Sequence, residues 1–165
     1  MYEKDGKLLR TIDWTRDSKG NLNATINYLD GSQGNVASRD VTMTKKDDGR
    51  FYLDTVTEKD KGNKVLAINR FEYEPNYIFH TYDDAQKAGL KNYYGYLLVK
   101  IVRTDINGKL LSTLFPAGGI SPLTGNTLIL ADGTKYELEK DATLEVLLNQ
   151  AALKVTSRFI KIHHV

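Results

Sequence analysis

Cysteine is absent from the 165 residues, and proline, histidine and tryptophan are scarce, with three, three and one copies. Without cysteine the chain has no disulfide scaffold, no thiolate zinc site and no cysteine nucleophile. The charges of the 23 basic and 21 acidic residues nearly cancel, so the protein has no general positive field to attract nucleic acid. We therefore expect no nucleic-acid partner. A chain of this length, 41% apolar, is expected to bury a sizeable core as a single domain over residues 1–165.

Long hydrophobic runs are also lacking. The longest uncharged stretch, 110–130, has the length of a membrane span, but it contains Pro116, Pro122 and several glycines, which favours a strand, a loop and a second strand. We therefore expect no transmembrane segment. The first six residues are polar and lack the apolar stretch of a secretory signal. The sequence leaves two locations open for the protein: the cytoplasm, or export after a signal has been removed.

What the chain does contain is a regular alternation of turns and short apolar runs. Pairs of Asp-Gly or Asn-Gly, which favour tight turns, occur at 5–6, 30–31, 48–49, 107–108 and 132–133. Over 22–29, apolar and polar side chains alternate with the period of a half-buried strand. Similar patterns predict strands over 8–16, 36–44, 51–58, 64–72, 77–82, 97–102, 109–115, 127–131, 134–139 and 155–164. These strands predict a mainly β fold, an antiparallel meander closed into a barrel or folded into two packed sheets.

One long amphipathic helix is predicted near the C-terminus, over 142–154. Asp141 is a suitable N-cap, and apolar residues recur at helical spacing at Leu144, Leu147, Leu148 and Ala151. The wide apolar stripe predicts packing against the sheet, and a last strand follows the helix. A second, short helix is expected over 83–88.

The order of meander, helix and last strand resembles the lipocalin barrel in layout. Trp14 lies on the first predicted strand, where lipocalins carry a tryptophan. Ile12 stands where the lipocalin motif has glycine, so no residue role is carried over from that family.

Aromatic residues are concentrated in the middle of the chain, where eight of the sixteen fall between residues 71 and 96. Tyrosine combines a large apolar surface with a polar tip, which suits binding surfaces, although it also favours strands and can simply line a core. Adjacent tyrosines on a strand point to opposite faces, so at least one ring of the pair at 93–94 is expected to be exposed. The candidate ligand-binding or partner-binding residues are Tyr77, Tyr82, Tyr93, Tyr94 and Tyr96.

An imidazole and two carboxylates lie close together in the sequence at His80, Asp83 and Asp84. A carboxylate can orient a histidine and raise its basicity, so this trio is the candidate for acid/base catalysis. The alternative is structural, because aspartates also cap and begin short helices. His163 and His164 would point to opposite faces of a strand and make a poor chelate, so we expect no metal site and no cofactor.

The sequence therefore predicts a non-enzymatic binding or interaction module. Its expected partner is a protein, a glycan or a small apolar ligand, recognised through a tyrosine-rich surface or pocket. Two alternatives stay open: an acid/base enzyme using His80 with Asp83 or Asp84, and a structural module of a surface or viral assembly.

Overall fold

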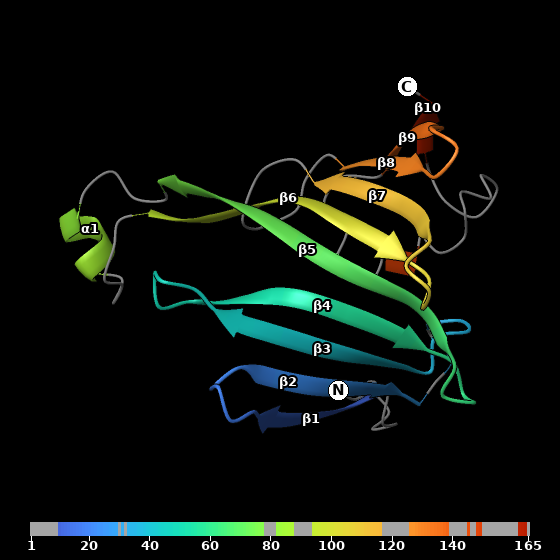
Figure 1. Cartoon of the computed structure of the whole chain (residues 1–165), viewed down its shortest axis with the longest axis horizontal. Helices are drawn as coiled ribbons and strands as arrows, with labels where there is room; N and C mark the ends of the chain where they lie inside the picture. The colour runs from blue at the N-terminus through green and yellow to red at the C-terminus, as the bar shows by residue number, and fades with distance from the viewer. Residues whose placement is uncertain are drawn as a thin grey trace, which may run out of the picture.

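The computed structural model describes residues 10–29, 31, 33–77, 82–87, 94–116, 126–138, 145, 148–149 and 162–164. Within these ranges, ten strands form one antiparallel sheet in which each strand pairs with its neighbours in the sequence (Figure 1). The strands are β1 (Arg10–Arg16), β2 (Leu22–Tyr28), β3 (Ser38–Lys45), β4 (Phe51–Lys59), β5 (Val65–Tyr77), β6 (Tyr94–Thr104), β7 (Leu110–Pro116), β8 (Asn126–Leu130), β9 (Lys135–Leu138) and β10 (Ile162–His164). A short helix, α1 (Tyr82–Lys87), follows β5 and lies beyond the end of the sheet (Figure 1).

Three of the hairpin turns are built in the same way. In each, the carboxylate of the first residue accepts the backbone N–H groups two and four positions further on, and these residues are Asp17, Asp60 and Asp105. The fourth residue of each turn has a positive φ, which is 84° at Gly20, 66° at Asn63 and 85° at Gly108. Glycine, and after it asparagine, adopts this left-handed backbone most easily, so the turn signals in the sequence fix where the strands end.

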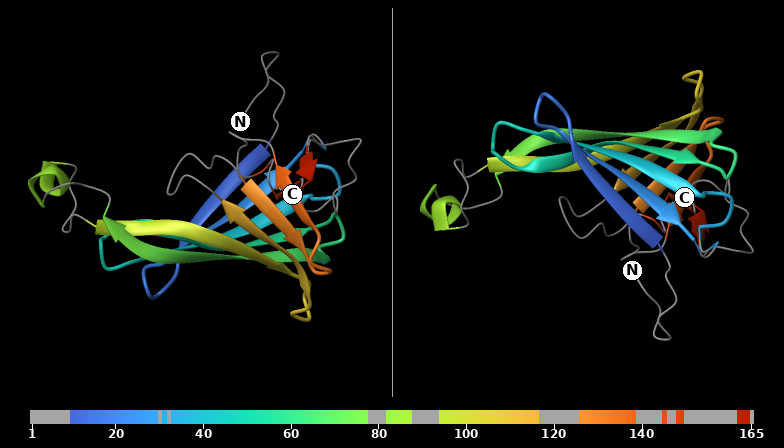
Figure 2. Two further views of the ribbon diagram at one scale, coloured as in Figure 1. Left: turned by 90° about the horizontal axis from the view of Figure 1, so that it is seen from above. Right: turned by 90° about the horizontal axis from the view of Figure 1, so that it is seen from below.

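The sheet is strongly curled. Seen from above and below, β1 and β2 at one edge and β8 and β9 at the other bend toward the same side of the central strands (Figure 2). Directly opposed residues share a face, and Val41 on β3 lies opposite Ala24 on β2 and Val56 on β4, all of them buried. This hollow, buried side is called the inner face. Its core continues through Phe71 and Ile101, which lie opposite each other on β5 and β6.

The prediction of a closed barrel is wrong, and so is its alternative of two packed sheets. All ten strands belong to a single sheet, and in the described ranges β1 pairs only with β2 and β10 only with β9. Closure requires both edge strands to pair with each other, and β10 offers only three residues. The lipocalin layout is therefore not reproduced, and the fold class is an open antiparallel β sheet.

The predicted C-terminal helix is not shown over its length. Of the range 142–154, the structure describes only Glu145, Leu148 and Asn149, which are helical, and the rest of that segment lies outside the described residues. Leu148 is buried and packs into the inner-face core. The short helix expected over 83–88 corresponds to α1.

One strand is longer than expected. Separate strands were predicted over 64–72 and 77–82, whereas β5 runs without a break from Val65 to Tyr77. Pro75 lies inside β5, opposite Tyr96 and beyond a shift of register between Glu72 and Tyr73. A residue before proline favours an extended backbone, so Pro75 continues the strand.

No helix in the described part of the chain has the length and apolar character needed to cross a bilayer.

Candidate functional site

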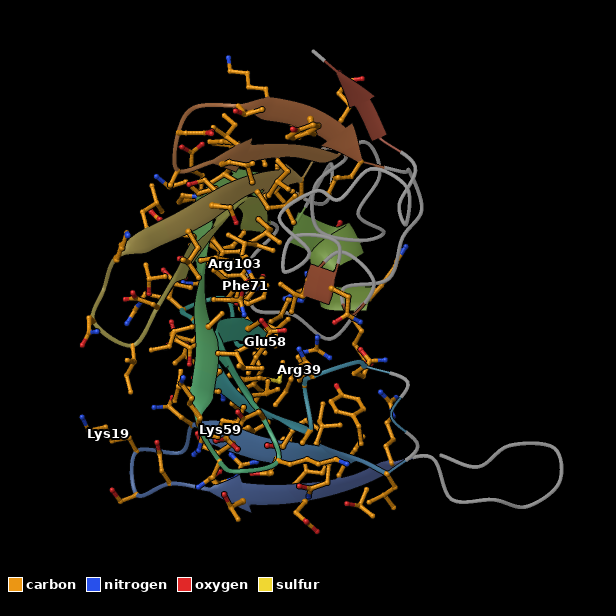
Figure 3. All side chains as sticks on the ribbon, turned by 90° about the vertical axis from the view of Figure 1, so that its right-hand side faces the viewer. Lys19, Arg39, Glu58, Lys59, Phe71 and Arg103 are labelled. Atoms are coloured by element: carbon orange, nitrogen blue, oxygen red, sulfur yellow. The ribbon has the colours of Figure 1, made fainter. Side chains whose placement is uncertain are left out.

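Charged and amide side chains gather at one end of the inner face. The strand register places Arg39 opposite Glu58, Asn69 opposite Arg103, and Arg103 opposite Ser112. All five side chains are buried. Figure 3 shows Arg39, Glu58 and Arg103 following one another along the hollow side of the sheet, beside Phe71 of the core. This polar row crosses β3 to β7 and is called the polar cluster.

Arg39 uses all of its hydrogen-bond donors inside the protein. Its Nε and Nη2 donate to Glu58 at 3.2 and 2.8 Å, and Nη2 also donates to Asn149. Its Nη1 donates to the Tyr28 hydroxyl and to Gln33. Burial works against the charged form, but the charge of Glu58 and the hydrogen bonds to Tyr28 and Glu58 together outweigh burial, and the pKa of Arg39 is raised above its ordinary value. Arg39 therefore ties the start of β3 to β4 and to the C-terminal part of the chain, and it has no donor left for a ligand.

Arg103 is only partly engaged. Its Nη1 donates to Glu58 at 2.7 Å and to the Asn69 side-chain oxygen at 2.8 Å. The buried Oγ of Ser112, opposite Arg103 on the next strand, has no hydrogen-bond partner in the described part of the chain. The polar cluster is thus saturated at Arg39 and incomplete at Ser112.

The polar cluster was not predicted, although the sequence contains a signal for it. On β3, Arg39 continues the inner-face series of Val41 and Met43, and on β6 Arg103 continues the series that includes Ile101. A polar residue that ends an apolar series at the same sheet end on several neighbouring strands indicates a shared buried cluster. In a single strand, one polar residue at the end of an apolar series does not indicate a cluster, so the signal appears only when neighbouring strands are compared.

Three tyrosines form a second cluster at the opposite end of the sheet. The ring of Tyr52 contacts those of Tyr73 and Tyr96 edge to face, with centroids 5.2 and 5.5 Å away. The ammonium of Lys46 lies 4.8 Å from the centroid of Tyr96 and 5.3 Å from that of Tyr73. These contacts are typical of aromatic packing with a cation over the rings.

The hydroxyl groups of this tyrosine cluster are also occupied. Tyr52 donates to Asp48 at 2.5 Å and Tyr96 to Asp47 at 2.6 Å, so the β3–β4 turn is tied to β4 and β6. Burial and then the hydrogen bond to Asp48 raise the pKa of Tyr52 from 10.0 to about 12. Burial likewise raises the pKa of Tyr73. Within the described residues, these three rings pack and brace the sheet.

The structure brings only some of the predicted tyrosines together. Tyr77 and Tyr94 lie directly opposite each other at the ends of β5 and β6, and Tyr96 belongs to the tyrosine cluster. Tyr82 begins α1. Tyr93 and the side chains of Tyr77, Tyr82 and Tyr94 lie outside what the structure describes, so their role in binding stays a prediction.

The candidate acid/base trio is untested. Asp83 is exposed on α1 and Asp84 also lies on α1, whereas His80 falls outside the described residues. In the part of the chain that can be searched, no group of three histidine, aspartate or glutamate side chains is placed to hold a metal ion.

The edge strand β1 exposes large apolar side chains. Trp14 is 57% exposed and Ile12 is 40% exposed. Their cross-strand partners on β2 are Ala24 and Ile26, so both lie on the inner face at its open rim. Trp14 is the only tryptophan of the chain. A neighbouring strand added beside β1 would extend the core and cover both side chains.

A cleft of about 500 Å³ lies at the end of the sheet, beside the β2–β3 loop and the β4–β5 turn. Tyr28 and Asp60 are among its lining residues. The Tyr28 hydroxyl already accepts from Arg39, and the Asp60 carboxylate accepts from the backbone of its own turn. The polar groups of these two residues are therefore engaged within the protein.

Comparisons of the chain with protein-family models, curated proteins and solved structures found no match. The arrangement is an open β sheet with a packed inner face, an incomplete polar cluster and an apolar edge strand.

Proposed function

We propose that this protein is a non-enzymatic binding module that recognises an extended segment of another protein along β1. The proposal rests mainly on the exposure of Trp14, whose side chain is 57% exposed although it lies on the same face as the core. An exposed aromatic side chain beside a second exposed apolar side chain, Ile12, is typical of a recognition surface. The packed inner face supports surface recognition over a ligand held deep inside the sheet.

The backbone of β1 supports an extended polypeptide as the partner. All seven residues of β1 pair with β2 in an unbroken register, and in the described ranges β1 has no second neighbour. Its other edge repeats N–H and C=O groups at the spacing of a strand, which another strand matches directly. Edge strands are usually blocked by proline, a bulge, short length or charged side chains. β1 has seven residues with no proline and no bulge, and its charged residues are Arg10, Asp13 and Arg16. At the other end of the sheet, β10 has only three residues.

The side chains of β1 define what the added segment must carry. Ile12 and Trp14 require apolar partners, and Arg16, which shares their face, favours an acidic one. Asp13 is exposed on the opposite face and favours a basic partner. The recognised segment is therefore extended, apolar at alternate positions and charged in the opposite sense to β1.

A second copy of β1 does not meet these requirements. Full antiparallel pairing of two β1 strands places Asp13 opposite Asp13 and Arg10 opposite Arg16. Like charges directly opposite each other destabilise a strand pair. The charge pattern of β1 thus favours a different polypeptide over self-pairing.

A peptide titration tests this proposal. The probe is the capped peptide Glu-Thr-Val-Lys-Val-Thr-Glu, which is complementary to β1 in both strand directions, and the control is the charge-reversed Lys-Thr-Val-Glu-Val-Thr-Lys. We expect the probe to move the emission of Trp14 to shorter wavelength, because the added strand covers the indole, and the control to leave the emission unchanged. Ile12→Ala should weaken binding of the probe about tenfold, because it removes buried apolar area.

Charge variants separate recognition at β1 from general attraction. Asp13→Lys should weaken binding of the probe, whereas Asp83→Lys, the same change on α1, should not. The proposal is wrong if neither peptide moves the emission, or if both peptides bind alike. It is also wrong if the protein alone sediments as a dimer in which Trp14 is already buried, since a second copy would then occupy β1.

A further inference from the structure

Basic side chains gather at the end of the sheet where β1 ends and where the β1–β2 and β3–β4 turns lie (Figure 1). Arg16 is the last residue of β1, and its guanidinium carbon lies 5.7 Å from the ring centroid of Phe51 at the start of β4. Lys45 lies directly opposite Phe51, and the backbone N–H of Lys46 donates to the carbonyl of Arg50 at 3.0 Å. Five basic residues on these two hairpins are together called the basic end: Arg16, Lys19, Lys45, Lys46 and Arg50.

The positive charges of the basic end have no ion pair among the described residues. The carboxylates of the same two turns already accept hydrogen bonds within the protein. Asp17 accepts backbone N–H groups of its own turn, and Asp47 and Asp48 accept from tyrosine hydroxyl groups. Lys19 projects from the β1–β2 turn away from the sheet (Figure 3). The basic end therefore presents several separate cations to an anionic partner.

Aromatic rings hold three of these cations in place. Arg16 lies over Phe51 and Arg50 lies over Tyr52, and in both pairs the guanidinium carbon is 5.7 Å from the ring centroid. The ammonium of Lys46 lies over the tyrosine cluster. A guanidinium over a ring keeps N–H groups at its edge for a carboxylate. Because the side chains are already positioned, less conformational freedom is lost when an anion binds.

The basic end is continuous with the exposed surface of β1. Arg16 shares a face with Ile12 and Trp14, so a strand added beside β1 passes Arg16 where it leaves the sheet. Strands in a sheet lie about 4.8 Å apart, which places β3 and Lys45 about 14 Å from such a strand. About four extended residues span this distance. A short segment of the bound polypeptide can therefore reach the β3–β4 turn.

We propose, on the basis of strand recognition at β1, that the recognised polypeptide carries an acidic segment directly before its strand and that the basic end binds this segment. Every strand pair of the sheet is antiparallel, so the added strand is taken to run antiparallel to β1, with its N-terminal end beside Arg16. Carboxylates of the segment pair with Arg16, Lys45 and Arg50. At the other end of β1, Arg10 is already paired with Glu145.

A nucleic acid fits the basic end less well than an acidic polypeptide does. Proteins bind single-stranded nucleic acids through a positive groove and through aromatic faces on which the bases stack. At the basic end, a cation already lies over Phe51 and another over Tyr52. The carboxylates of Asp17 and Asp47, both on exposed residues, also interrupt the positive charge. Separate carboxylates on an extended chain match separate cations better than a continuous polyanion does.

Titration of the Trp14 emission with longer forms of the probe tests the acidic segment. The probe Glu-Thr-Val-Lys-Val-Thr-Glu is extended at its N-terminus by Glu-Glu-Glu-Gly, and the matched control carries Gln-Gln-Gln-Gly instead. We expect the acidic extension to tighten binding about five- to tenfold at low salt, because it adds several exposed ion pairs, and we expect the gain to disappear at about 1 M salt. The extension Gly-Glu-Glu-Glu at the C-terminus of the probe should give little gain.

A double variant separates the basic end from β1. Lys45→Gln combined with Arg50→Gln removes two cations and leaves β1 unchanged. It should cancel the gain from the acidic extension and bind the unextended probe as the unmodified protein does, which also shows that the variant is folded. Lys61→Gln, on an exposed residue of the β4–β5 turn at the other end of the sheet, is the control and should keep the gain.

Failure at the basic end is distinguishable from failure at β1. If the unextended probe moves the Trp14 emission but the acidic and glutamine extensions bind alike, the proposal for the basic end is wrong and recognition at β1 stands. A gain that persists in the double variant would also overturn it. If the unextended probe does not move the emission, both proposals are wrong. A thymidine oligonucleotide that displaces the extended peptide from the unmodified protein, but does not bind the double variant, would overturn the choice of an acidic polypeptide.

Discussion

Glu58 is the carboxylate on which two buried guanidinium groups depend. Its Oε2 accepts from Arg39 and its Oε1 from Arg103, and all three side chains are almost fully buried. A buried ion pair adds little net stability compared with apolar packing, but removal of one partner leaves a desolvated charge. Glu58 therefore holds β3, β4 and β6 together mainly because, without its carboxylate, Arg39 and Arg103 would be buried charges with no buried counter-charge.

We predict that Glu58→Gln lowers the free energy of unfolding by about 3–5 kcal/mol, measured by urea denaturation, because two buried cations lose their only buried counter-charge. Glu72→Gln is the matched control. Glu72 pairs with Lys100 at 3.6 Å on the exposed side of the sheet, and its loss should change stability by less than about 1 kcal/mol. Similar effects of the two substitutions would contradict the role assigned to Glu58.

At the scale of elements, the turns explain why the strands were predictable. Each turn of the Asp17, Asp60 and Asp105 type ends a strand with a carboxylate that binds its own backbone and a residue at positive φ. This chemistry is local, so it is visible in the sequence. The predicted strand over 51–58 and the observed β4 differ by one residue for the same reason.

The turns also yield a prediction about glycine. Gly108 has a φ of 85°, and a Cβ there would meet no atom within 4 Å, so backbone strain alone opposes a side chain. Gly108→Ala should lower the free energy of unfolding by about 1–2 kcal/mol. Gly108→Asn should cost less than half of that, because Asn63 already occupies the same place in the β4–β5 turn.

Urea denaturation of the two variants and of one control measures this difference. Gly62→Ala, in the neighbouring turn, places its Cβ in ordinary contact with Asp60 and needs no positive φ, so its effect should be within about 0.5 kcal/mol. Equal costs for alanine and asparagine at position 108 would show that the left-handed backbone is not what selects glycine.

The curl of the sheet and the contacts between distant residues could not be predicted from the sequence. Alternation shows which residues of a strand share a face, but it does not show how far a sheet curls or whether its edges meet, and the closed barrel was predicted wrongly for that reason. Arg39 and Arg103 are 64 positions apart and become neighbours only through Glu58 on the strand between β3 and β5. Trp14 is exposed because β1 is an edge, and the strand pattern alone does not show which strand is an edge.

At the scale of the whole molecule, the two sides of β1 are unequal. One side is fully paired with β2, and the other ends the sheet (Figure 1). Ile12 and Trp14 are exposed at this edge. The curl of the sheet keeps this rim in line with the core, so one added strand would continue both the hydrogen-bond ladder and the buried face. These features together favour recognition of an extended polypeptide at β1.

Backbone amide exchange, followed residue by residue with and without the peptide Glu-Thr-Val-Lys-Val-Thr-Glu, tests that claim most directly. In an antiparallel strand, alternate N–H groups point to opposite neighbours, so the amides of β1 that point away from β2 should exchange much more slowly when the peptide is bound. The amides of β10, at the other edge, should keep their rates. A peptide that moves the emission of Trp14 and leaves the β1 amides unprotected would contradict strand addition.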